Sequence, residues 1–293
     1  MPALPAASAL MRLTPRDRAL LGALHELRYL TVAQIQEVCF PTITAASVSH
    51  RLTVLRRRGL LDCLSHRTFG DRRAFWGLTA LGRAAAAGLD GAEPARPGAP
   101  VAALHMDHLV ATNQVFCDLC REHAAGRLGP FHWRGSQHSH VNLGQTHLVP
   151  DAVILVASPD GGWWMYLLEL DRHTMPESAL ADKFDRYHLM YRLAAARRDD
   201  PLWELRADAW VLFACRDEKR ATMAARLAGG CGLERMWAGS ARECAAGLAA
   251  AVGPGVCPAV RPGACCDVPS PALTGGIAPP PRSIIAEREE VSR

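Results

Sequence analysis

The sequence predicts a two-domain protein of the α/β class with a disordered C-terminal tail. Two shifts in composition place the boundaries: a Pro/Gly/Ala-rich segment typical of a linker, and a second crowding of Pro and Gly near the C-terminus. Apolar residues at helical spacing precede the first boundary, and strand-like runs alternate with helical patterns after it. We expect a mostly helical domain at 13–88, a linker at 89–100, an α/β domain at 101–252 and the tail at 253–293.

The sequence predicts a cytoplasmic protein. The chain has no run of 18 apolar residues, so we expect no membrane-spanning helix. Its first 13 residues are apolar but lack the basic start and cleavage site of a signal peptide. The 10 cysteines are spread along the chain, several within apolar helical patterns, which favours reduced and buried thiols over disulfides.

Positive charge is concentrated at the N-terminal end. Residues 1–88 contain 12 arginines and no lysine against five acidic residues, whereas the chain as a whole has a net charge of only +4. A basic module therefore precedes a mildly acidic body. This asymmetry predicts that the N-terminal domain binds a polyanion such as nucleic acid.

The order of elements in the first domain predicts a winged helix-turn-helix. Thr14 and Thr31 can cap free amides and so begin two helices. A third helix is expected from about 44 to 58, and runs at 60–66 and 72–78 flank a turn and predict a hairpin. In domains of this type one helix enters the major groove and the hairpin contacts flanking phosphates. The alternative is a winged helix used only for protein contact.

The third helix carries the expected DNA-contacting residues. Val48, Leu52 and Leu55 form a buried stripe at helical spacing, and the opposite face is small or polar, as entry into a major groove requires. The residues expected to approach bases are Ser47, Ser49, His50, Thr53 and Arg57. Those expected to approach phosphates are Arg51, Arg56, Arg58, Arg67, Arg72 and Arg73.

Acidic residues are placed at the ends of two predicted strands in the second domain. A strand at 150–156 begins next to Asp151, and a strand at 163–171, apolar on both faces and hence central, ends with Glu169 and Asp171 on one face. Carboxylates at the end of an apolar strand need a compensating cation or donor. Asp151 with Glu169 has the spacing used to hold Mg²⁺ against a scissile phosphate.

This strand–turn–strand–helix order around Asp151 and Glu169 resembles the PD-(D/E)xK, or restriction-endonuclease-like, fold. In that pattern a lysine follows the glutamate by two residues, but here the position holds Asp171, and Lys183 on the next helix is the candidate substitute. The candidate catalytic residues are Asp151, Glu169, Asp171 and Lys183, with the three acids as Mg²⁺ ligands. The open alternatives are an active nuclease, a nuclease-like fold without activity, and an unrelated α/β sheet.

Other chemistries receive little support. Cys117, Cys120 and His123 have half the spacing of a zinc site, but they lie in a continuous helical pattern that suits buried thiols equally well. The chain has no P-loop, which argues against ATP-driven action, and no Gly-x-Ser-x-Gly elbow for nucleophilic catalysis.

Taken together, these motifs resemble the replication-relaxation family of plasmid and mobile-element proteins. The resemblance spans roughly residues 13–215 and is most specific in its second half. The residues that carry it are Leu13, Thr14, Asp17, Pro150, Asp151, Glu169, Asp171, Arg172, Thr174, Lys183 and Tyr187. It implies a role in plasmid replication and DNA relaxation, with DNA-binding regulation.

We therefore expect a protein that binds double-stranded DNA at a plasmid or mobile-element replication or transfer region. Non-enzymatic binding is the preferred hypothesis. A Mg²⁺-dependent nuclease or nickase is the first alternative, and a winged-helix transcription regulator is the second. A regulator that forms a homodimer would bind a palindromic site.

Overall fold

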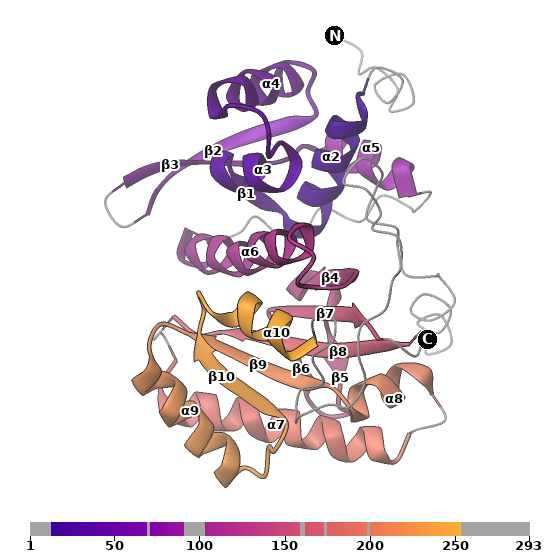
Figure 1. The fold of residues 1–293 in the computed structure, drawn as a ribbon, viewed down its shortest axis with the longest axis vertical. Coiled ribbons are helices and arrows are strands. Elements are labelled where there is room, and N and C mark those ends of the chain that lie inside the picture. Colours follow the sequence, from indigo (N-terminus) through magenta and orange to yellow (C-terminus); the bar gives the residue numbers. More distant parts are fainter. Residues whose placement is uncertain are drawn as a thin grey trace. The chain divides into compact units, whose positions relative to one another are not determined.

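The computed structural model describes residues 13–68, 71–90, 103–158, 162–172, 175–197 and 200–252, and it confirms the predicted α/β class (Figure 1). The predicted tail at 253–293 and residues 91–100 of the predicted linker lie outside the described residues. The chain forms two compact units, which divide in sequence at Cys117 and Asp118, within a single helix. No helix in the ranges described here combines the length and the hydropathy needed to cross a membrane.

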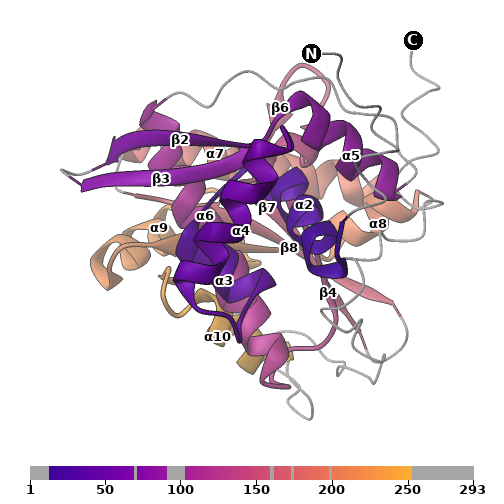
Figure 2. The same ribbon diagram turned by 90° about the horizontal axis from the view of Figure 1, so that it is seen from above.

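The first unit combines helices with a small antiparallel sheet of order β1-β3-β2. Its elements are α2 (Pro15–Leu27), β1 (Tyr29–Thr31), α3 (Val32–Cys39), α4 (Ala45–Arg57), β2 (Leu61–Thr68), β3 (Asp71–Leu78), α5 (Ala80–Asp90) and the first part of α6 (Ala103–Ala124). Figure 2 shows the hairpin of β2 and β3 extending beyond the helices of this unit.

Side-chain caps explain where the helices begin. Thr14 and Thr31 each accept a hydrogen bond from a backbone amide three residues later, and each forms a full capping box, which confirms the two predicted starts. The Thr44 side chain caps α4 by accepting a hydrogen bond from the Ser47 amide, and Gly59, with φ of 75°, follows the last turn of α4. The predicted buried stripe of α4 is also confirmed, since Val48, Leu52 and Leu55 are all buried.

The first part of α6 is bound to the first unit by side-chain amides. Asn113, which is fully buried, donates to the carbonyl oxygens of Leu27 at 2.9 Å and of Tyr29 at 2.8 Å. Gln34 on α3 donates to the carbonyl of Val110 at 2.9 Å. These bonds satisfy backbone acceptors at the end of α2 and along α6, so this helix is part of the packing of the first unit.

The second unit is built on a five-stranded mixed sheet of order β10-β9-β8-β7-β4. Strands β4, β7 and β8 are antiparallel neighbours, whereas β8, β9 and β10 are parallel. Its elements are β4 (Phe131–Gly135), η1 (Ser136–His138), β5 (Val141–Asn142), β6 (His147–Leu148), β7 (Ala152–Ala157), β8 (Trp163–Leu170), α7 (Glu177–Ala195), α8 (Pro201–Ala207), β9 (Trp210–Cys215), α9 (Glu218–Gly230), β10 (Met236–Ser240) and α10 (Cys244–Val252).

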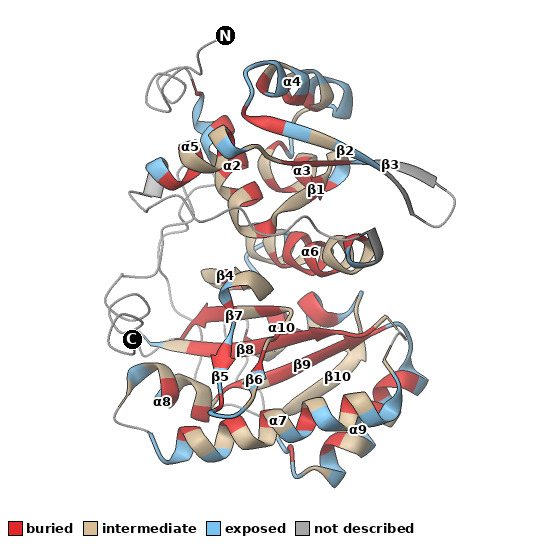
Figure 3. Ribbon diagram, turned by 180° about the vertical axis from the view of Figure 1, so that it is seen from behind, coloured by how far each residue is buried: buried red, intermediate tan, exposed pale blue. Residues whose placement is uncertain are grey.

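Strand β8 is central, as its two-sided apolar pattern predicts, and Figure 3 shows the buried residues concentrated in β7, β8 and β9. Helices α7, α8 and α9 cover one face of the sheet, where Phe184 of α7 packs edge-on against Phe213 of β9 with ring centroids 5.8 Å apart. The crossover between the parallel strands β8 and β9 runs through α7 and α8. Because α7 begins just after β8 ends, its inner side chains lie close to the acids at the end of β8.

Candidate functional site

Helix α4 presents a polar face to solvent. Ser47, His50, Thr53 and Arg57 are exposed, and Ser49 is half-buried. The hydroxyl of Thr53 donates to the carbonyl of Ser49 at 2.9 Å, which leaves its oxygen lone pairs available as acceptors. All five residues expected to approach bases therefore lie on one accessible helix, opposite or beside its buried stripe.

The last turn of α4 adds positive charge to this face. Arg56, Arg57 and Arg58 are all exposed. Arg56 lies 3.8 Å from the carboxylate of Asp62, with both side chains more than half exposed, so this ion pair contributes little stability. Cations at the C-terminal end of a helix also interact favourably with its dipole, which offsets part of the repulsion among the three arginines.

The predicted wing arginines lie in the long hairpin. Arg67 pairs with Arg72 across β2 and β3, and Arg73 pairs with His66. The backbone thus places the three arginines next to one another near the end of the hairpin. Their side chains are outside the described part of the structure, so their predicted contacts with phosphate stay predictions.

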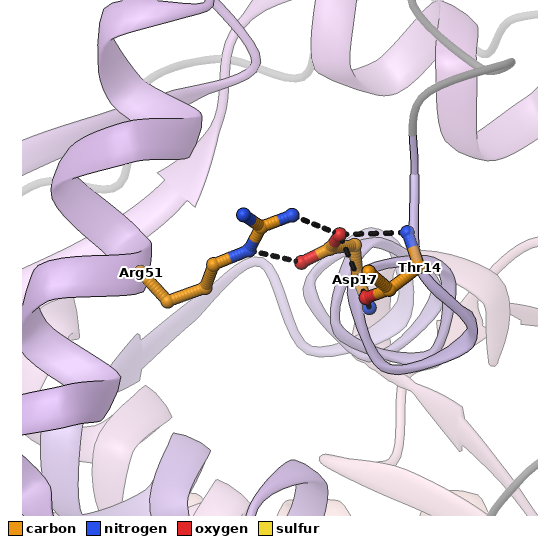
Figure 4. A network of polar contacts seen from close by, with 3 residues as sticks. All are labelled: Thr14, Asp17 and Arg51. Atoms are coloured by element: carbon orange, nitrogen blue, oxygen red, sulfur yellow. Dashed lines mark hydrogen bonds and ion pairs between the residues drawn. The ribbon is translucent and has the colours of Figure 1, made fainter.

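Arg51 differs from the other predicted phosphate contacts. Its guanidinium turns away from the exposed face and forms a bidentate ion pair with Asp17 of α2, with Arg51 Nε 2.7 Å from Asp17 Oδ1 (Figure 4). The Arg51 side chain is only 29% exposed and that of Asp17 1%. In the structure the charge of Arg51 is thus paired with Asp17 inside the unit, and its predicted contact with phosphate stays a prediction.

In the second unit, the end of β8 and the middle of α7 form a buried polar cluster. Glu169 accepts hydrogen bonds from Lys183 Nζ on one carboxylate oxygen and from the Tyr187 hydroxyl on the other. Lys183 and Tyr187 lie one helical turn apart on α7, which allows both to reach the same carboxylate. Asp151 precedes β7 and accepts from the Leu170 amide at 2.8 Å, which holds it beside Glu169.

Burial and charge shift the ionisation of this cluster. Loss of hydration raises the pKa of Glu169 from its usual 4.5 to about 7, and the charge of Asp151 adds to this effect, although Lys183 opposes it. Burial lowers the pKa of Lys183, but the negative charges of Glu169 and Asp151 outweigh burial and leave it above 10.5. Burial, together with Glu169, raises the pKa of Tyr187 well above 10, so this phenol stays protonated.

Asp171 is separated from this cluster by its own partner. Arg220 at the start of α9 forms a buried ion pair with Asp171 and also donates to the carbonyl of Met175 at 2.7 Å. The sequence correctly indicates that both acids need compensation, but it does not identify Arg220 as the partner of Asp171. The signal that could have identified Arg220 is its position in the helix after β9, the parallel neighbour of β8.

The carboxylates as placed do not fit a Mg²⁺ ion. Both oxygens of Glu169 are occupied by Lys183 and Tyr187, and one oxygen of Asp171 is held by Arg220. Among the residues that the structure describes, no group of three or more His, Cys, Asp or Glu side chains is arranged to hold a metal ion. In the candidate zinc motif, Nδ1 of His123 lies 2.9 Å from the carbonyl oxygen of Leu128, and Cys117 is buried.

The comparisons with known proteins agree with the family resemblance. The family model described as replication-relaxation matches residues 21–201, a stretch that covers more than half of the chain and includes α4, Asp151, Glu169 and Lys183. Neither the curated proteins nor the solved structures contain a match. The extent of the family match is sufficient on its own: this chain belongs to the replication-relaxation family.

Proposed function

We propose that the protein binds double-stranded DNA through its first unit and acts in the replication or transfer of a plasmid or mobile element. Membership of the replication-relaxation family supports a role connected with replication. The single observation that carries the DNA-binding part is the exposed polar face of α4, with Arg56 and Arg57 in its last turn and Arg58 at its C-cap.

The order of elements supports a winged helix-turn-helix as the DNA-binding domain. Helices α2, α3 and α4 are followed by the β2–β3 hairpin, and β1 completes the small sheet. In this arrangement α4 would enter the major groove, where Ser, Thr, His and Arg side chains can contact base edges. The hairpin arginines would contact flanking phosphates, which supply affinity but little sequence information.

An alanine substitution at Arg57 tests this proposal in the full-length chain. Arg57→Ala should weaken binding to the preferred duplex by about 1–3 kcal/mol and relax the preference at one base position. The matched control is Arg226→Ala, which removes an arginine that is 72% exposed on α9 of the other unit. The measurement is a gel-shift titration. Equal effects of the two substitutions would refute α4 as the DNA-binding helix.

A nuclease-like second unit is the second candidate function, and one observation favours it. Lys183 reaches Glu169 from the helix after β8, and Asp151 lies beside this pair. A lysine that takes the place of the one expected two residues after the glutamate would need this position. However, each Glu169 oxygen already accepts a hydrogen bond from a protein donor, and the acids that the structure describes are not arranged around a metal ion. We therefore rank a nuclease-like fold without activity above a Mg²⁺-dependent nuclease.

Incubation of supercoiled plasmid with Mg²⁺ or with EDTA distinguishes an inactive nuclease-like fold from a Mg²⁺-dependent nuclease. An active nuclease would nick the plasmid only with Mg²⁺, would lose activity in Asp151→Ala, and would keep it in Asp182→Asn, a change to an exposed acid of α7. A nuclease-like fold without activity gives no nicking in any sample. Mg²⁺-dependent nicking that Asp151→Ala abolishes would instead identify an active nuclease.

A further inference from the structure

Asp17 is buried more deeply than its local role requires. It is the third residue of α2, and its carboxylate accepts hydrogen bonds from the amide and the hydroxyl of Thr14, both at 2.8 Å. A capping box of this kind satisfies backbone donors equally well at the protein surface. Asp17 is nevertheless 0% exposed. Because burial of a carboxylate costs hydration energy, capping alone does not explain its position.

The compensating cation comes from the helix that we propose binds DNA. Arg51 of α4 donates two hydrogen bonds to Asp17, one to each carboxylate oxygen (Figure 4). Burial raises the pKa of Asp17, but the bonds from Arg51 and Thr14 outweigh it and hold the pKa below its usual value of 3.8. Asp17 is therefore charged at neutral pH, and the pair is a planar, bidentate link between α2 and α4.

This link restricts a motion that the apolar contacts of α4 leave open. The buried stripe of α4 packs through non-directional apolar contacts, which tolerate a small rotation of a helix about its own axis. A bidentate pair requires both donors to face both acceptors, so it is sensitive to such a rotation. Arg51 lies at the edge of the buried stripe, directly after His50 on the exposed face. Rotation that breaks the pair would also redirect His50, Thr53 and Arg57.

We infer that Asp17 is a positioning residue for DNA recognition: through Arg51 it fixes the rotation of α4 that presents the exposed face to base edges. This inference rests on the proposed function of α4. Asp17 itself lies on a different helix, is buried, and its carboxylate binds α4 through Arg51. Its substitution should therefore reduce sequence discrimination while leaving the phosphate contacts in place.

The test compares two duplexes and four full-length proteins. One duplex is selected from a randomised pool by the wild-type protein, and the other has the same composition in scrambled order. The variants are Asp17→Asn, which keeps a capping acceptor but loses the charge, Arg51→Lys, which keeps the charge but loses the bidentate geometry, and Arg57→Ala as a positive control on the exposed face. Circular dichroism at the assay temperature gives the folded fraction, to which each affinity is normalised.

We expect Asp17→Asn and Arg51→Lys to lower the ratio of the two affinities by about 10-fold or more, the effect of one misplaced base contact. The slope of log K against log salt should stay at the wild-type value, because the exposed arginines that contact phosphates remain. Where Asp17→Asn fails to fold, Arg51→Lys, which retains a charge opposite Asp17, decides the question.

Two results would overturn the inference. An unchanged affinity ratio in a folded variant, even one with a lower melting temperature, would leave Asp17 with a structural role only. An equal loss of affinity for both duplexes would indicate a general structural effect. These outcomes differ from failure of the proposed function, which would appear as no binding by the wild-type protein or no effect of Arg57→Ala.

Discussion

Lys183 and Glu169 form a buried ion pair that joins the middle of α7 to the end of β8. The Lys183 side chain is 16% exposed and that of Glu169 is 3% exposed. Tyr187 occupies the other oxygen of the same carboxylate. The acid on β8 and the lysine and tyrosine on the next helix, which carry the resemblance to the family, thus form a single physical unit. Each member satisfies a polar group that would otherwise be buried without a partner.

The two lysines of the chain provide a matched test of this unit. Lys183→Met should lower the free energy of unfolding at pH 8 by about 3–5 kcal/mol, because it leaves the Glu169 carboxylate buried and unpaired. Lys219→Met, at an exposed position of α9, should change it by less than about 0.5 kcal/mol. Urea unfolding measures both. At pH 5 the cost at Lys183 should shrink, because Glu169 can then take up a proton.

The raised pKa of Glu169 predicts how stability depends on pH. The folded protein keeps a proton on Glu169 up to about pH 7, whereas the unfolded chain releases it near the usual 4.5. Between these values the folded state binds more protons, so this residue's contribution to stability is full below about pH 4.5 and is lost as the pH rises through about 7.

The comparison that isolates this effect is with Glu169→Gln. The free energy of unfolding of the wild type, relative to that of the variant, should fall as the pH rises from 4.5 to 7. Thermal unfolding monitored by circular dichroism across this range measures the difference. A difference that is flat, or that increases with pH, would mean that Glu169 is charged in the folded protein throughout.

Two helical glycines should respond oppositely to alanine. A Cβ atom at Gly82 of α5 would lie 2.0 Å from the carbonyl oxygen of Leu60, so the backbone would have to move. Gly82→Ala should therefore destabilise the protein by about 1–3 kcal/mol. At Gly22 of α2 a Cβ atom would meet nothing within 4 Å, and alanine should stabilise the helix by about 0.5–1 kcal/mol.

Urea unfolding of both glycine variants provides the check. The opposite signs matter more than the sizes, because both substitutions raise intrinsic helix propensity equally. Stabilisation by Gly82→Ala would show that α5 does not pack against Leu60 as closely as described.

Much of the fold could be predicted because the relevant signals are local. The caps at Thr14 and Thr31, the buried stripe of α4 and the central position of β8 each depend on residues within a few positions of one another. The same locality placed the polar face of α4 on the exposed side. The three-residue strand β1 was not predicted, because so short a segment has no periodicity.

The ion-pair partners could not be predicted from local pattern. Arg51 and Asp17 are 34 positions apart, and Arg220 and Asp171 are 49 apart. An arginine on the flank of a basic helix looks the same in sequence whether it contacts a phosphate or a buried carboxylate. The sequence also does not show that Asp171 and Glu169 have different cationic partners. Only the fold reveals that α9 brings Arg220 to Asp171 at the end of β8.

The most direct test of the account is the salt dependence of duplex binding by the full-length protein, measured by fluorescence anisotropy. We predict binding at low salt, a linear fall of log K with log salt, and a slope reduced by about one unit in Arg72→Ala. Absence of binding at low salt, or binding that salt leaves unchanged, would contradict the proposal that the first unit binds DNA.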